Sequence, residues 1–411
     1  PMIPGIVIAA LATLIAATTI AQPFRDDFNS VTPTNFDSGG AVSRQFHLNA
    51  ESYRHATTIA RTAPARDLAT SLRPEVAGFA VTHSGGTETF GEYVANNPYI
   101  DGVIALHRGT VVFEAYPRME PWQRHFAWSV TKVLTSTALA VLVEAGQVDR
   151  DAPVDRYVPA LKDSAWAGIP VQHVADMASG IDCLDSDGYQ NTKTCIYAME
   201  ESLGVTAPTG RDLDFIARLQ EMQLYRDSGF THEYVSANTN VLMLVIESVT
   251  GKAYAQAVQD LVWSRIGAEA DALMTISHDG YAYASGGLSA RLRDVARFGQ
   301  VYAQPELSGV LSPATVEAIR SGGVPLSDDS ADSPATVDSD KPLRGSWQWD
   351  KVWADGALFK GGYSGQGLYV DVERDLVVAW FGTGDSFDLH SHELLSVTRQ
   401  LVGAGVFDIS R

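Results

Sequence analysis

The sequence is short of basic residues and of cysteine, and both shortages limit what the protein can do. Its 411 residues include 30 lysines and arginines against 49 aspartates and glutamates, which gives a formal net charge of −19. No basic stripe occurs along the chain, so nucleic acid is not an expected partner. The same acidity disfavours polyanionic substrates and anionic membrane surfaces.

Only two cysteines are present, Cys183 and Cys195, and no histidine lies between or beside them. A metal site at this pair is therefore not expected. The histidines show no zinc-ligand spacing except at His390 and His392, near the C-terminal end. We expect neither a metal nor any other cofactor.

Residues 3–21 form an unbroken run of apolar and small residues that meets a polar sequence at Gln22. Such a run is typical of an export signal or a single membrane anchor, although a buried core helix has a similar composition. We expect residues 1–22 to be a signal peptide or anchor, and the protein to be periplasmic, secreted or anchored through residues 3–21. In an oxidising compartment the two cysteines, which bracket a polar loop, are expected to form one disulfide.

The rest of the chain predicts an α/β (α+β) fold. Residues 23–95 are a polar extension without a chemical motif, expected to wrap the main body. Strand-like runs at 102–106 and 111–116, and again at 367–372 and 376–382, lie on either side of a helical region. This order predicts an antiparallel sheet flanked by helices and split by an inserted helical domain. The expected α/β domain spans 96–165 and 277–411, and the helical insert spans 166–276.

Ser129 and Lys132 open a stretch of helical periodicity that ends at Gly146. Three residues apart on a helix, the hydroxyl and the amine lie on one face. A serine becomes a nucleophile when a base takes its proton, and a lysine is that base only where burial or a helix N-terminus lowers its pKa. A capping serine beside an exposed lysine would show the same spacing. The spacing alone therefore does not identify a catalytic pair, and other residues of the chain are needed as evidence.

Two later segments contain groups suited to act together with Ser129 and Lys132. Tyr234 and Ser236, two residues apart in an extended or turn segment, point the same way, and the phenol is placed to relay protons. The glycine-rich sequence from Phe359 to Gly367 enters a clear strand, where backbone N–H groups can approach a substrate carbonyl. They would form half of an oxyanion hole, with the N–H of Ser129 as the other half. A packing tyrosine and a simple glycine-rich bend are the alternative interpretations.

Ser-x-x-Lys, then Tyr-x-Ser, then Lys-Gly-Gly before a strand is an order that resembles serine β-lactamases and penicillin-binding proteins. The resemblance extends from about Tyr99 to the C-terminus and implies a β-lactamase-like fold. Ser236 stands where class C enzymes usually have Asn, and Lys360-Gly361-Gly362 replaces Lys-Thr-Gly. Both departures look like the 6-aminohexanoate-dimer hydrolases and related carboxylesterases, and the lost threonine puts recognition of a β-lactam carboxylate in doubt.

The resemblance implies a set of site residues. The implied catalytic residues are Ser129, Lys132 and Tyr234. The implied oxyanion donors are the backbone N–H groups of Ser129 and Tyr363. The implied substrate-binding residues are Tyr189, Ser236, Lys360 and Gly362.

The function expected from these residues is a serine hydrolase that cleaves a small ester or amide through an acyl-enzyme on Ser129. The expected partner is the small-molecule substrate, with membrane contact only through an uncleaved N-terminal segment. A true β-lactamase or D,D-peptidase is one alternative. A catalytically silent envelope binding protein is the other, disfavoured because all three residues needed for the chemistry are present.

Overall fold

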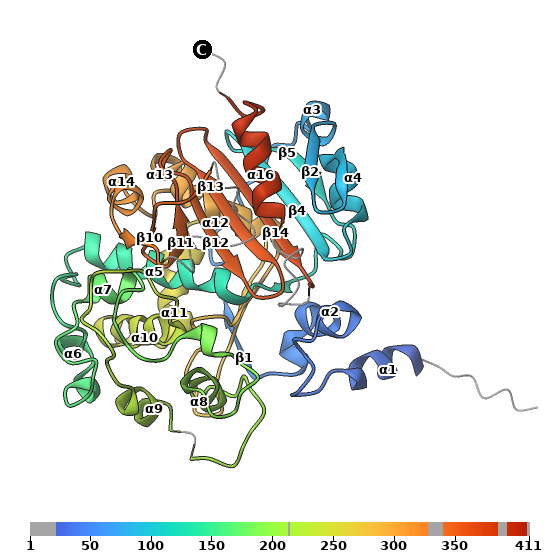
Figure 1. The fold of residues 1–411 in the computed structure, drawn as a ribbon. Helices are drawn as coiled ribbons and strands as arrows, with labels where there is room; N and C mark the ends of the chain where they lie inside the picture. The colour runs from blue at the N-terminus through green and yellow to red at the C-terminus, as the bar shows by residue number, and fades with distance from the viewer. Residues whose placement is uncertain (1–21, 213, 328–339, 385–392, 409–411) are drawn as a thin grey trace, which may run out of the picture.

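The computed structural model describes residues 22–212, 214–327, 340–384 and 393–408 (Figure 1). Its centre is an eight-stranded antiparallel sheet in which strands from both ends of the sequence meet, because β4 pairs with β14. The strands in spatial order are β5 (Thr110–Ala115), β4 (Ile100–His107), β14 (Leu376–Gly382), β13 (Gln366–Asp371), β12 (Leu358–Gly362), β11 (Trp349–Val352), β10 (Arg344–Ser346) and β9 (Val324–Pro325).

Alternating side chains of these strands enter two separate cores. Val378 and Trp380 of β14 pack toward α16 (Leu394–Gly403), whereas Val377 and Ala379 pack toward α12 (Leu292–Ala303). Figure 1 shows α16 in front of the sheet and α12 behind it. A sheet covered on both faces explains why its central strands are apolar at nearly every position. The predicted antiparallel sheet flanked by helices is confirmed.

Helix α5 (Thr131–Glu144) runs through the larger core, and its residues from Thr131 to Leu142 are all buried. Two of its hydroxyl groups pair with tyrosines from other helices. Thr135 Oγ1 lies 2.6 Å from Tyr254 Oη, and Thr137 Oγ1 lies 2.7 Å from Tyr302 Oη. This helix therefore has a fixed position, and the residues at its N-terminus are fixed with it.

Further helices lie beside α5 in the lower half of Figure 1. They are α6 (Val154–Tyr157), α7 (Val171–Ala175), α8 (Cys195–Ser202), α9 (Phe215–Glu221), α10 (Ser236–Thr250) and α11 (Tyr254–Val258). A π-helical turn at Gln259–Trp263 continues α11. Two short helices, α13 (Pro305–Ser308) and α14 (Pro313–Ser321), follow α12. The division of the chain at residues 166 and 276 stays a prediction.

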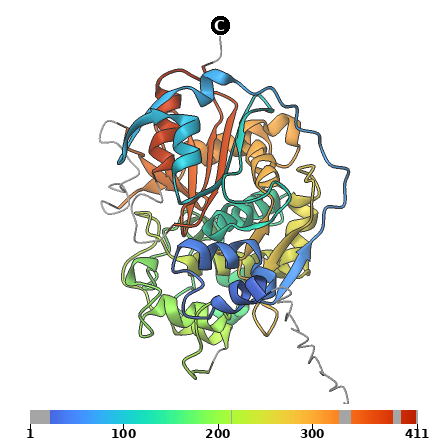
Figure 2. The same ribbon diagram turned by 90° about the vertical axis from the view of Figure 1, so that its right-hand side faces the viewer.

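The N-terminal extension is more structured than its composition indicates. It contains α1 (Gln22–Ser30), α2 (Gly40–Leu48), α3 (Pro74–Ala77), α4 (Phe90–Asn96) and the hairpin of β2 (Ala80–His83) and β3 (Gly86–Thr89). A second sheet has the order β1 (Ala56–Ile59), β7 (Ala272–Thr275), β8 (Leu288–Ala290) and β6 (His125–Phe126). Figure 2 shows the segment after α2 running along the side of the molecule toward α3. The extension thus wraps the body and completes one of its sheets.

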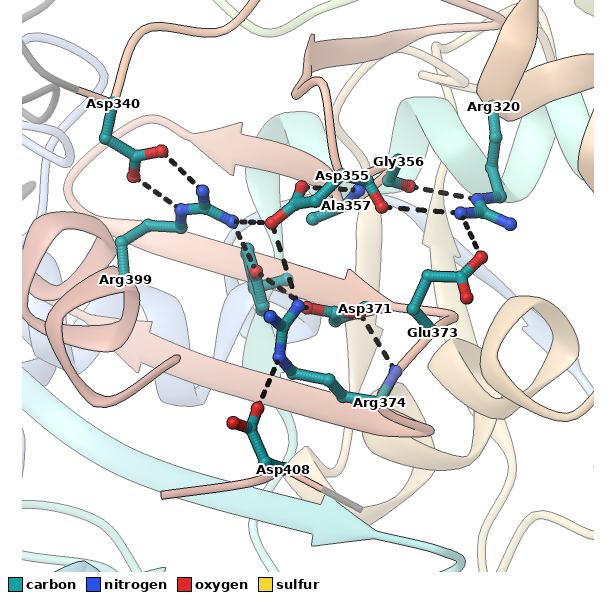
Figure 3. A network of polar contacts seen from close by, with 11 residues as sticks. Arg320, Asp340, Asp355, Gly356, Ala357, Asp371, Glu373, Arg374, Arg399 and Asp408 are labelled. Carbon is teal, nitrogen blue, oxygen red and sulfur yellow. Dashed lines mark hydrogen bonds and ion pairs between the residues drawn. The ribbon is translucent and has the colours of Figure 1, made fainter. Parts of the chain in front are cut away.

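A polar network ties the C-terminal helix to one end of the main sheet (Figure 3). Arg399 of α16 donates to Asp340 at 2.5 and 2.6 Å and to Asp355 at 2.9 Å. Nearby, Arg374 lies 3.7 Å from Asp355 and 3.3 Å from Asp408. The arginines join α16 and the C-terminal residues to the segments around Asp340, Asp355 and Arg374 at this end of the sheet.

Within the described ranges, no single helix has the length and apolar character to cross a membrane. One bent pair, Ser236–Thr250 with Tyr254–Trp263, meets the criteria of length and composition. The export signal or anchor expected at residues 3–21 lies outside the described residues.

Candidate active site

The predicted nucleophile and base are in contact at the start of α5. Ser129 is the middle residue of a 3₁₀ turn, Trp128–Val130, and Lys132 is in the first turn of the helix that follows. Lys132 Nζ lies 2.9 Å from Ser129 Oγ and donates to the Ser285 carbonyl at 2.8 Å. Because Lys132 is buried, the alternative of an exposed lysine beside a capping serine is wrong.

Burial changes the acidity of Lys132. It lowers the pKa of this amine to about 7, and the positive charge of Lys360 acts in the same direction. The acidic groups of Asp185, Asp350 and Glu200 oppose the shift without reversing it. A large fraction of Lys132 is therefore uncharged at neutral pH, and an uncharged amine can accept the serine proton.

Tyr234 faces both lysines. Its phenol oxygen accepts a hydrogen bond from Lys360 Nζ at 2.8 Å, and Lys132 Nζ lies 5.0 Å from its ring centre. Burial raises the pKa of Tyr234 well above its usual value of 10, while a hydrogen bond with Ser129 acts in the opposite direction. The phenol consequently keeps its proton at neutral pH and can donate it.

Lys360 and Ser236 are held by acidic partners and are absent from the cavity wall described below. Lys360 Nζ lies 2.5 Å from Asp350 Oδ1 and is fully buried behind Tyr234. Ser236 Oγ donates to Asp185 Oδ2 at 2.5 Å, and its backbone N–H donates to Asp185 Oδ1 at 2.7 Å. Both side chains support the Tyr234 segment, and their role in substrate binding stays a prediction.

The glycine-rich strand end lies against the nucleophile turn. A Cβ at Gly362, the last residue of β12, would come within 2.8 Å of the Ala127 carbonyl oxygen, so only glycine allows this approach. Tyr363 follows, and its ring centre is 5.1 Å from that of Trp128, the residue before Ser129. The two predicted oxyanion residues, Ser129 and Tyr363, thus belong to adjacent segments and line the same cavity.

That cavity has a volume of about 230 Å³. Its wall comes from the nucleophile turn, the loop closed by the two cysteines, α8 and the N-terminal extension. Its lining residues are Pro33, Thr34, Phe36, Asp37, Trp128, Ser129, Tyr189, Gln190, Thr192, Tyr197, Glu200, Thr206, Ala207, Tyr283 and Tyr363. Tyr189 lines this cavity, and its role in substrate binding stays a prediction.

The N-terminal extension contributes more to the site than its sequence predicted. Four of its residues line the cavity, and a fifth, His47 of α2, supports the wall. Trp128 Nε1 donates to His47 Nε2 at 2.8 Å, and Trp128 has a left-handed backbone φ of 47°. Burial lowers the pKa of His47 well below its usual range, so the ring stays neutral and accepts this bond. These contacts join residues far apart in sequence, and no local motif marks them.

Cys183 and Cys195 form a disulfide, as expected. It closes the loop that carries Asp185, Tyr189 and Gln190, and a disulfide is typical of proteins that fold in an oxidising compartment. Among the residues that the structure describes, no group of three or more His, Cys, Asp or Glu side chains is arranged to hold a metal ion. His390 and His392 lie outside the described residues.

The fold and the contacts among Ser129, Lys132 and Tyr234 together indicate the class of protein. A family model described as Beta-lactamase matches residues 100–395. The chain belongs to this beta-lactamase family, and it is a serine hydrolase. The predicted family, fold and enzyme class are confirmed.

Individual relatives show which members of this family the chain resembles. The chain is similar to a 6-aminohexanoate-dimer hydrolase of Paenarthrobacter ureafaciens, with 31% identity over 309 residues, 72% of this chain and 77% of the relative. A solved structure from Bacillus anthracis, provisionally named a 6-aminohexanoate-dimer hydrolase, has a TM-score of 0.77 at 23% identity and covers 93% of this chain and 99% of its own. A class C beta-lactamase from Rhodobacter sphaeroides has a TM-score of 0.52 at 17% identity over 75% of this chain and 95% of its own. The two structures show a shared fold.

Proposed function

We propose that the protein hydrolyses a linear amide or a small ester through an acyl-enzyme on Ser129. One observation carries the proposal: Lys132 Nζ is 2.9 Å from Ser129 Oγ, buried, and has a pKa of about 7 beside a cavity lined by that serine. A nucleophile and a base within hydrogen-bonding distance are the minimum for covalent catalysis at neutral pH.

In the acylation step, neutral Lys132 takes the hydroxyl proton while Ser129 Oγ attacks the substrate carbonyl carbon. The carbonyl oxygen becomes an oxyanion, and the backbone N–H groups of Ser129 and Tyr363 are its donors. The carbonyl–nitrogen or carbonyl–oxygen bond then breaks, and Tyr234 gives its proton to the leaving amine or alcohol. The lysine returns its proton to the phenol, which leaves an ester on Ser129 and the two side chains as they began.

Deacylation repeats these roles with water. Lys132 takes a proton from the water that attacks the acyl carbon, and the same proton returns to Ser129 Oγ as the acid departs. Lys360 is a positioning residue in this scheme, because it holds the Tyr234 oxygen at 2.8 Å and is itself held by Asp350 at 2.5 Å.

Cavity composition supports a linear amide or ester over a β-lactam. Among the described residues that line it, none is lysine, arginine or histidine, and the carboxyl groups of Asp37 and Glu200 are present. A penicillin carboxylate would enter this cavity without a cationic partner. The similarity to a 6-aminohexanoate-dimer hydrolase also supports a linear amide substrate. β-Lactamase or D,D-peptidase activity is the less supported alternative.

The proposal is tested by turnover of a p-nitrophenyl ester and of a linear oligoamide. Ser129→Ala should abolish both activities. Ser136→Ala, which removes a buried hydroxyl from helix α5, should leave them nearly unchanged. Ester and amide hydrolysis that persists in Ser129→Ala would contradict the assigned nucleophile. No turnover by the wild type with any member of an ester, amide and cephalosporin panel would favour a silent binding protein.

The disulfide supports a location in an oxidising compartment, and we propose that the protein is periplasmic or secreted. Mapping of Cys183 and Cys195 in protein isolated from its native cells tests this. Two free thiols in that material would contradict it.

A further inference from the structure

The residue before the nucleophile has a backbone conformation that depends on its surroundings. Trp128 has a left-handed φ of 47°, and it is the first residue of the 3₁₀ turn that carries Ser129. Such a conformation is disfavoured for a residue other than glycine and persists where surrounding contacts hold it. The positions of Ser129 Oγ and of the Ser129 N–H therefore depend on the contacts that hold Trp128.

Two different parts of the molecule hold this turn. The main body holds its backbone, since the Ala127 N–H donates to the Leu288 carbonyl at 2.7 Å and Gly362 packs against the Ala127 carbonyl. The N-terminal extension holds its side chain, because Trp128 Nε1 donates to His47 Nε2 at 2.8 Å. An indole N–H can only donate, so Nε2 carries no proton and the His47 ring is a neutral acceptor.

His47 is itself held in a fixed position. Its ring is buried, and the ring centre lies 4.9 Å from that of His125. His125 Nε2 lies 3.1 Å from Asp101 Oδ2, and Arg44, three residues before His47 on α2, donates to Asp101 Oδ1 at 2.7 Å. One buried carboxylate thus binds both the helix that carries His47 and the ring that packs on it.

We propose that His47 is a positioning residue, which acts through the Trp128 indole to hold Ser129 where its hydroxyl can attack the substrate. The role rests on the proposed hydrolysis at Ser129 and gives the N-terminal extension a part in the chemistry beyond its share of the cavity wall. The reacting groups all come from later in the chain, and α2 adds precision to their placement. A displacement of about 1 Å in such a group can cost on the order of a hundredfold in rate.

Replacement of His47 should slow the chemical step without weakening substrate binding. His47→Leu removes the acceptor, so kcat for a p-nitrophenyl ester should fall by about tenfold or more, with KM within about twofold. His47→Gln offers an amide oxygen near the position of Nε2 and should restore most of the lost rate. Gln45→Leu is the matched control on α2, because the Gln45 amide bonds Tyr53 instead of the nucleophile turn, and it should keep the wild-type kcat.

Trp128→Phe removes the donor of the same hydrogen bond and leaves no unpaired N–H in the core. It should lower kcat to a similar extent, and His47→Leu added to it should cause little further loss. Urea midpoints show which variants are folded in the assay, and Trp128→Phe keeps the comparison possible if His47→Leu does not fold. Full kcat in either folded single variant, or losses that multiply in the double variant, would overturn the proposal.

Labelling by a fluorophosphonate separates this role from the proposed function, because it reports the reactivity of Ser129 without a substrate. In that reaction Ser129 Oγ bonds to phosphorus, fluoride leaves, and the hydroxyl proton passes to Lys132. The labelling rate should fall in His47→Leu by about the same factor as kcat, on the order of tenfold or more, and recover in His47→Gln.

Two outcomes distinguish the hypotheses. If the wild type turns over no ester or amide but its labelling at Ser129 depends on His47, the hydrolytic function fails and the positioning role stands. If esters are hydrolysed through Ser129 while His47→Leu is labelled as fast as the wild type, the positioning role fails alone.

Discussion

At the scale of single residues, the proposed chemistry depends on an amine that burial keeps partly uncharged. Lys132 is inside the core, its pKa is lowered to about 7, and Lys360 contributes to that shift. Burial raises the pKa of Tyr234, so its phenol keeps its proton at neutral pH. The same low-dielectric surroundings therefore produce a base and an acid side by side.

The pH dependence of acylation follows from these shifts. The active form of Lys132 is neutral, so the rate should rise by about tenfold per pH unit below pH 7 and level off above it. The raised pKa of Tyr234 predicts no falling limb from that phenol near neutrality. Stopped-flow release of p-nitrophenol measures the profile.

Replacement of Lys132 provides the control. Lys132→Met and Lys132→Arg should both abolish acylation, because methionine has no basic atom and a guanidinium stays protonated. An active Lys132→Arg enzyme, or a wild-type rate independent of pH between 5 and 8, would contradict the role of this lysine as the base.

Tyr363 should act on the oxyanion through its backbone. Tyr363→Phe keeps the N–H and should retain most of kcat, changing mainly the preference among substrates through the lost bond to Asp37. Loss of an oxyanion donor costs on the order of a hundredfold or more in kcat. A Tyr363→Phe enzyme with a loss of that size, measured as kcat for a neutral ester, would assign the phenol a direct catalytic role.

At the scale of elements, the loop between the two cysteines is as important as the strand and helix that carry the reacting groups. Its Asp185 holds Ser236 by two hydrogen bonds, and its Tyr189 and Gln190 line the cavity. The disulfide fixes this loop, and the loop in turn fixes the positions of the Tyr234 segment and of one cavity wall.

Removal of the disulfide should therefore affect both stability and substrate binding. Cys183→Ala with Cys195→Ala should lower the free energy of unfolding by about 2–4 kcal/mol, because the denatured chain gains freedom. The KM should rise as the cavity wall loses order. Urea titration and steady-state kinetics measure the two effects, with the reduced wild type as a control, and an unchanged KM would contradict the role of the loop.

Features that depend on contacts between residues close together in the sequence could be predicted from the sequence. Ser129 and Lys132 lie on one helix turn, so their contact is set by local geometry, and the last two strands show apolar sequences that packing on both faces requires. Tyr234 and Tyr363 are predicted from the order of motifs that the family shares, and their roles in catalysis stay predictions.

The missed features depend on contacts between distant segments. The sequence of residues 33–37 contains no periodic or chemical signal, yet this segment forms one wall of the cavity. The Lys-Gly-Gly motif does not show that Asp350, on the neighbouring strand β11, pairs with Lys360 of β12. A partner of that kind is visible only once the sheet order is known.

At the scale of the whole molecule, stability and chemistry depend on different regions. The arginine network of Figure 3 joins α16 and the C-terminal residues to one end of the main sheet, and none of its labelled residues lines the cavity. The apolar residues on the two faces of that sheet likewise form separate cores.

Arg399→Met should consequently lower stability without changing the chemistry. It removes hydrogen bonds to Asp340, Asp355 and Tyr369, which are worth about 1–3 kcal/mol together once the partial exposure of the aspartates is considered. Arg218→Met, which breaks an ion pair with the exposed Glu221, should cost less than about 1 kcal/mol. Urea midpoints and kcat/KM measure this, and a large loss of kcat in Arg399→Met would show that the regions are coupled.

Formation of an acyl-enzyme on Ser129, with Lys132 as base, can be observed by mass spectrometry of protein quenched during ester turnover. We expect one added acyl group on the peptide containing Ser129, absent from Ser129→Ala and from Lys132→Met. An acyl group on any other residue, or an unmodified protein under conditions where deacylation is rate-limiting, would contradict it.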